Sequence, residues 1–150
     1  MMVTHRTFTK SLFATAILAM GIAGCSSMLP SNKVTLSGQL TAAQEVPPTA
    51  STGTGMAEAW LNKDTNVLTW KVSFSGLTGP ATAAHFHGPA AAGSNAGVVV
   101  PFSGTTSPLE GQATLTPAQA ADLLAGKWYA NVHTAANKGG EIRGQMTPKM

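Results

Sequence analysis

Cysteine is almost absent from this chain, since Cys25 is the only one in 150 residues. A single thiol cannot form an intramolecular disulfide, so the sequence excludes a disulfide-held scaffold. It also excludes metal sites built from several thiolates. The fold must therefore be held by its hydrophobic core, which is feasible for the roughly 115 residues beyond the N-terminal region.

Charged residues are also scarce. Nine Lys and Arg against six Asp and Glu give a net charge of +3, and beyond residue 24 seven basic and six acidic residues remain, for a net charge of +1. The sequence contains no cluster of Lys and Arg, so we expect no nucleic-acid partner and no polybasic membrane patch. The low charge also argues against electrostatic steering of a charged substrate.

Motifs of several common enzyme classes are missing. The sequence has no Gly-x-Ser-x-Gly nucleophile elbow, and none of the glycines at positions 53, 55, 76 and 79 is followed by the Lys-Ser/Thr of a phosphate-binding loop. These absences favour a binding module over an enzyme.

No apolar run reaches the roughly 20 residues that a transmembrane helix needs. Residues 12–23 are apolar, follow a basic N-terminal stretch and end in small residues before Cys25. This pattern is typical of a secretory signal peptide. The tetrapeptide Ile-Ala-Gly-Cys at 22–25 resembles the lipobox of bacterial lipoproteins, which implies cleavage after residue 24 and acylation of Cys25, with palmitate as one such acyl group.

The sequence thus divides into a signal peptide (1–24), a lipidated cysteine with a polar linker (25–33) and one domain (34–147). Two or more acyl chains suffice for stable membrane anchoring. We therefore expect an exported protein attached to the cell envelope by its N-terminal lipid. The serines after Cys25 resemble the outer-membrane default. An ordinary signal peptide with an incidental cysteine is the alternative.

From residue 34 onward, apolar residues recur at every second position, as in β-strands. Strands are predicted at 34–40, 57–61, 68–74, 81–87, 98–102, 109–115, 128–133 and 141–146. One short helix is predicted, with Thr116 as N-cap, Pro117 at its first position and Gly126 closing it. This series predicts an all-β, single-domain Greek-key β-sandwich, immunoglobulin-like or superoxide-dismutase-like.

Three stretches carry a family resemblance: LTAAQEVPP at 40–48, AHFHGP at 84–89 and YANVHTAANKGGEIRGQ at 129–145. Together they resemble the CHRD domain, which is named for chordin, an extracellular antagonist of bone morphogenetic proteins, and which also occurs singly in bacterial secreted proteins. The resemblance implies an exported β-sandwich, but growth-factor binding does not carry over to a bacterial-type lipoprotein. Lys138 departs from the family pattern, which has proline before the paired glycines.

Three histidines remain beyond residue 24, and all of them fall in these stretches: His85, His87 and His133. Side chains two apart on a strand share a face, so His85 and His87 project together while Phe86 faces the core. His133 is predicted on the face opposite Trp128. If the two strands are neighbours, three imidazoles converge, and neutral imidazole is a common ligand of copper and zinc.

This histidine set leaves three interpretations open: a metal site, with copper preferred to zinc; histidines that only brace loops; and a metal-free ligand pocket. His-x-His and Val132-His133 also resemble the copper ligands of copper–zinc superoxide dismutase, a Greek-key β-sandwich with a substrate-guiding arginine about where Arg143 lies. Beyond residue 24 there is no fourth histidine to bridge copper and zinc. A metalloenzyme of that kind is therefore a second alternative, after a protein-interaction or structural module of the envelope with an unidentified protein partner.

Asn131, Glu141 and Arg143 are predicted to support the site. Glu141 and Arg143 are two residues apart and would share the face of His133, where Glu141 can accept a hydrogen bond from an imidazole. The alternative is an ion pair or a bond to the loop at residues 44–45. Asn131 can bond locally to the backbone.

Overall fold

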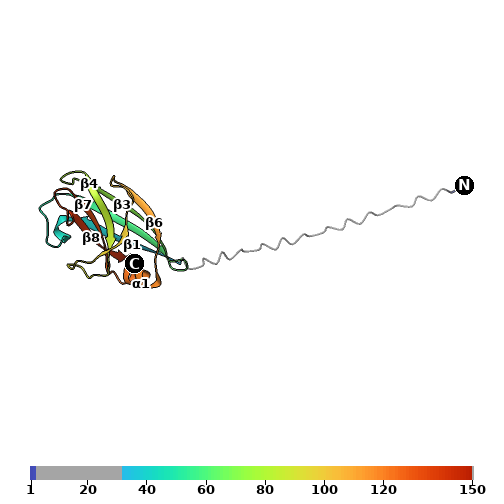
Figure 1. Cartoon of the computed structure of the whole chain (residues 1–150). Coiled ribbons are helices and arrows are strands. Elements are labelled where there is room, and N and C mark those ends of the chain that lie inside the picture. The colour runs from blue at the N-terminus through green and yellow to red at the C-terminus, as the bar shows by residue number, and fades with distance from the viewer. Residues whose placement is uncertain (3–31, 150) are drawn as a thin grey trace.

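The computed structural model describes residues 1–2 and 32–149 (Figure 1). The predicted signal peptide, apart from its first two residues, and the predicted lipidation site at Cys25 lie outside the described residues. Among the described residues, no helix is both long and apolar enough to cross a membrane.

Eight strands form one antiparallel sheet in the order β5-β4-β7-β8-β1-β2-β3-β6. Their bounds are β1 Lys33–Thr41, β2 Thr54–Asn62, β3 Val67–Ser75, β4 Ala81–His87, β5 Val98–Pro101, β6 Leu109–Thr114, β7 Trp128–Thr134 and β8 Ile142–Pro148. The helices are α1 (Pro117–Leu124) and a 3-10 turn, η1 (Ala42–Gln44). The predicted all-β fold with one short helix is confirmed, and the strands form one continuous sheet that curls around a single core (Figure 1).

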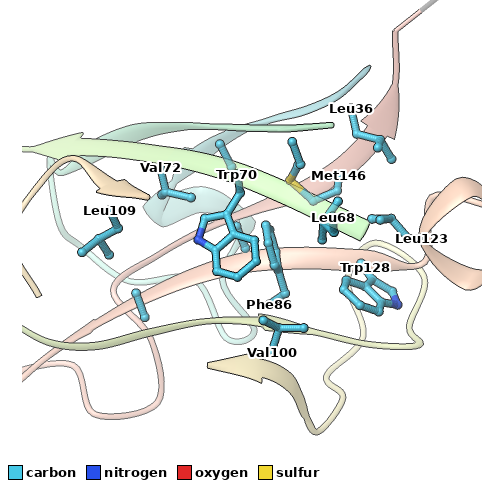
Figure 2. Packing of buried hydrophobic residues seen from close by; sticks show 14 of the residues in the cluster. Leu36, Leu68, Trp70, Val72, Phe86, Val100, Leu109, Leu123, Trp128 and Met146 are labelled. Carbon is cyan, nitrogen blue, oxygen red and sulfur yellow. The ribbon is translucent and has the colours of Figure 1, made fainter. Parts of the chain in front are cut away.

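Aromatic side chains join the two halves of the curled sheet. Trp70 on β3 meets Phe86 on β4 edge-on, with ring centroids 5.6 Å apart, and stacks on Phe102 at 5.2 Å. β5 and β6 form the two ends of the sheet. The rings therefore join the β4–β5 end of the sheet to the β3–β6 end by side-chain packing. Figure 2 shows Trp70 and Phe86 side by side in the core.

Local signals placed the turns and the helix correctly. The Asn62 side-chain oxygen accepts bonds from the backbone N–H groups of Asp64 and Thr65, which closes the β2–β3 hairpin. Thr116 and Gln119 form a reciprocal capping box at the start of α1. Gly126 follows the helix with φ +71°, as expected for a left-handed helix terminator.

Strand β7 is buried along its whole length, on both faces. Its core face carries Trp128, Ala130 and Val132, as the alternation predicts. The opposite face is also withdrawn from water, since Tyr129 and Asn131 there are at most 3 % exposed. Loops 88–97 and 135–140 supply atoms that bond to Tyr129 and His133 on this face. The loops therefore form a second, polar layer outside the sheet.

The register fixes which side chains share this polar layer. Asn131 on β7 pairs with His85 on β4 and with Arg143 on β8, and Arg143 pairs in turn with Thr41 at the end of β1. Tyr129 pairs with His87 in the adjacent row. β4 and β7 are thus neighbours, which is the condition that the sequence left open for convergence of the three imidazoles.

The closing aromatic cluster predicts a large loss of stability in Phe86→Ala. Truncation of a fully buried ring leaves a cavity, and the free energy of unfolding should fall by about 3–5 kcal/mol. Urea denaturation measures this difference. Thr82→Ala, at an exposed position on the same strand, serves as the control and should change stability by less than about 0.5 kcal/mol. Equal effects of the two substitutions would contradict the role of Phe86 in closing the sheet.

Candidate metal centre

The three predicted histidines come together. One ring nitrogen from each of His85, His87 and His133 lies within 4.8 Å of the corresponding nitrogens of the other two. Nδ1 of His85 is 3.3 Å from Nε2 of His133. Two ligands that each lie 2.0–2.1 Å from a tetrahedral ion are separated by about 3.3–3.4 Å, so this pair is already spaced as two ligands of one ion would be.

Backbone carbonyls fix the protonation of two of these rings. Nδ1 of His87 lies 3.0 Å from the carbonyl oxygen of Ala96, and Nδ1 of His133 lies 3.0 Å from that of Lys138. A carbonyl oxygen only accepts hydrogen bonds, so both Nδ1 atoms carry the proton. In the neutral ring Nε2 then presents its lone pair, which is the arrangement that orients metal-binding histidines.

The Nε2 atom of His87 is buried and has no hydrogen-bond partner among the described residues. Buried polar atoms are nearly always paired, so an orphan of this kind needs an explanation. A ligand at the centre of the three rings would supply the missing partner. The donor set therefore fits a metal ion on chemical grounds as well as by position.

The surroundings favour neutral rings. Burial lowers the pKa of His85, and repulsion from His133 and His87 lowers it further. Burial also lowers the pKa of His87, although the bond to Ala96 acts in the opposite direction. Both imidazoles are therefore neutral at pH 7, which is the form that binds metal.

Tyr129 holds His87 in position. The two rings stack nearly parallel, with centroids 4.8 Å apart and an angle of 3° between their planes. The Tyr129 hydroxyl accepts a bond from the Ala96 N–H and donates to the Ala96 carbonyl, the same oxygen that binds His87. Tyr129 was not among the predicted site residues. Tyr129 lies directly opposite His87 in the pairing of β4 with β7, and this position can be recognised only once the strand register is known.

Arg143 contacts Tyr129 from the β8 side. Its guanidinium carbon lies 3.4 Å from the Tyr129 ring centroid, and its NH groups donate to the side chain of Asn95 and the carbonyl of Ser94. These two hydrogen bonds hold loop 88–97 against the sheet, and the Arg143 side chain is only 2 % exposed. It is not presented to solvent as the analogy with a substrate-guiding arginine implied.

Asn131 lies in the same row as His85 and donates to the buried carboxylate of Glu45 and to the carbonyl of Ile142. Burial raises the pKa of Glu45, while the bond from Asn131 and the charge of Arg143 act to lower it. Glu45 therefore adds a buried acid to this polar layer.

Glu141 holds three loops together and, among the described residues, forms no hydrogen bond with an imidazole. Its fully buried carboxylate accepts bonds from the side chains of Ser51, Thr78, Thr134 and Asn137 and from the Thr78 N–H. The predicted hydrogen bond to His133 is not formed, because His133 uses the carbonyl of Lys138. Burial alone would raise the pKa of Glu141, but these hydrogen bonds outweigh it and lower the pKa to about 2.

The depressed pKa of Glu141 predicts acid sensitivity. Because the folded-state pKa of about 2 lies below the ordinary value of 4.5, the ionised carboxylate stabilises the fold above pH 4.5. This contribution, about 3 kcal/mol, is lost as the pH falls towards 2. In Glu141→Gln, the free energy of unfolding should depend less on pH between 5 and 2.5. Urea titrations across this range test it, with exposed Glu110→Gln as control. An unchanged pH slope in Glu141→Gln would contradict the assignment.

Comparison with known proteins gives one match. The family model of the CHRD domain matches residues 36–146, which include all three histidines and most of the described strands. No curated protein and no solved structure shows a significant match. Since the matched region covers well over half of its length, the chain belongs to the CHRD domain family.

Proposed function

We propose that this protein is an extracytoplasmic copper-binding module whose ligands are His85, His87 and His133. The observation that carries the proposal is the buried, unpartnered Nε2 of His87 within a group of three ring nitrogens less than 5 Å apart. Histidines with a purely structural role would be expected to have both ring nitrogens paired or in water.

Copper is the best candidate ion for these ligands. Imidazole suits copper and zinc alike, but copper(II) binds a given nitrogen site more tightly than zinc in the Irving–Williams order. The donor set has no thiolate, which zinc sites of the structural kind use. Three protein ligands leave a position open for a further ligand.

The proposed location follows from the N-terminal sequence and the family. Residues 1–24 act as a lipoprotein signal peptide, and Cys25 carries the lipid that holds the domain to the envelope, in the outer membrane by the signal of the following serines. The polar linker connects this anchor to β1, which begins at Lys33.

Metal stoichiometry tests the site. The chain from Ser26 onward contains all eight strands and the whole core, and after metal stripping it should take up about one copper ion per molecule. Each substitution of His85, His87 or His133 by Ala should weaken copper binding by more than the roughly 10–100-fold typical of residues that only support a ligand. The triple variant should bind none.

Bound copper and zinc would be counted by mass spectrometry after separate loading. Thr82→Ala, an exposed change on β4, should bind copper like the unmodified protein. Circular dichroism checks that each variant is folded. A folded, unmodified domain that takes up neither ion would overturn the proposal and leave the histidines as braces of loops in a structural or protein-interaction module.

The anchor has its own test. In a bacterial host, the full chain should incorporate labelled palmitate and sediment with membranes. Cys25→Ser removes the acylated sulfur and should abolish both labelling and membrane association, whereas Ser27→Ala should leave both unchanged. Labelling that persists in Cys25→Ser would exclude lipidation at this residue.

A further inference from the structure

The copper centre proposed above has only neutral ligands. The group of candidate ligand atoms contains three imidazoles, and no Asp, Glu or Cys among the described residues joins it. Neutral nitrogens do not offset the charge of the ion they bind, so a second positive charge on the metal must be stabilised by the surroundings. Imidazole binds copper readily, and the charges near the site therefore influence which oxidation state is preferred.

A buried cation lies near the three rings. Tyr129 lies between His87 and Arg143: its ring centroid is 4.8 Å from that of His87 and 3.4 Å from the guanidinium carbon of Arg143. The guanidinium carbon can therefore be no more than about 8.2 Å from the His87 ring. Arginine stays protonated at all relevant pH values, and among the described residues the guanidinium of Arg143 donates to the neutral acceptors of Asn95 and Ser94.

A buried acid acts in the opposite sense but is placed less directly. Glu45 contacts the site through Asn131, to which it is hydrogen-bonded, and not through a ring stacked on a ligand. It is withdrawn from water, which disfavours its ionised form. In the loops that cover the polar layer, at 45–50, 88–97 and 135–140, Lys138 is the only other charged residue. Glu141, which follows the last of these loops, is ionised because its pKa is about 2, but its charge is taken up by five hydrogen bonds from Ser51, Thr78, Thr134 and Asn137. Arg143 is therefore the charge that is coupled to a ligand ring by direct stacking, through Tyr129.

We propose, on the basis of the copper site above, that the centre binds copper(I) more tightly than copper(II), and that Arg143 is the positioned charge that sets this preference. An ion bound to Nε2 of His87 would lie about 3 Å beyond the ring centroid, and so at most about 11 Å from the guanidinium carbon. One positive charge at that distance, at the effective dielectric of partly buried sites, changes relative affinity by roughly tenfold. Arg143 thus determines the oxidation state that the site selects without contacting the ion.

Three variants separate charge from structure. Arg143→Met removes the cation and should lower the ratio of copper(I) to copper(II) affinity about tenfold, which corresponds to a reduction potential lower by about 59 mV for one electron. Arg143→Lys keeps the charge and should largely restore the ratio. Glu45→Gln removes the opposing charge with little change of shape and should raise the ratio or leave it unchanged.

Affinities would be measured on the chain from Ser26 onward by competition with a chromophoric copper(I) chelator under reducing, oxygen-free conditions and with a copper(II) chelator in air. Reduction potentials would be measured on the loaded protein. Tighter binding of copper(II) by the unmodified protein would overturn the inference, as would a ratio that falls in Glu45→Gln as it does in Arg143→Met. If neither ion binds, it is the copper site itself that fails.

Discussion

The polar face of β7 is withdrawn from water, and every donor and acceptor on it must then find a partner inside the protein. Three side chains meet this requirement through loops. The Tyr129 hydroxyl bonds both backbone groups of Ala96, and the Asn131 amide donates to the Glu45 carboxylate. The His133 imidazole donates to the carbonyl of Lys138. Unpaired buried polar groups are costly, so the three loops are held to the sheet by the same bonds that orient the site. A change that releases one of these loops is therefore expected to disturb the geometry of the site as well.

Glu141 fixes the far side of this arrangement. Its carboxylate gathers donors from segments that are distant in sequence, including Ser51 and Thr78. In addition, its N–H donates to the carbonyl of Val132 on β7, next to His133. The turn that supplies the carbonyl bonded to His133 begins at Thr134 and ends at Glu141, so the acid anchors both ends of the segment that sets the tautomer of that ring.

The sequence predicted more of the fold than of the site's support. Period-two alternation and short apolar runs identified the strands, and Thr116 and Gly126 bounded the helix, because these signals act within a few residues. The face shared by His85 and His87 followed from strand geometry alone. Their meeting with His133 depended on β4 and β7 being neighbours, and no local pattern encodes strand order. For the same reason, Tyr129 and Glu45 were not identified as site residues: one acts across strands and the other across 86 residues of chain.

The register between β1 and β8 places the three histidines far from the start of β1. The row of side chains that contains His85 meets β1 at Thr41, eight residues along the strand from Lys33, or about 26 Å at the usual rise of a strand. The chain enters the domain at Lys33 and its C-terminal residues lie beside that entry, where Lys149 bonds Thr35. In a domain tethered at its N-terminus, the histidines would thus lie at the end of the domain farther from the tether.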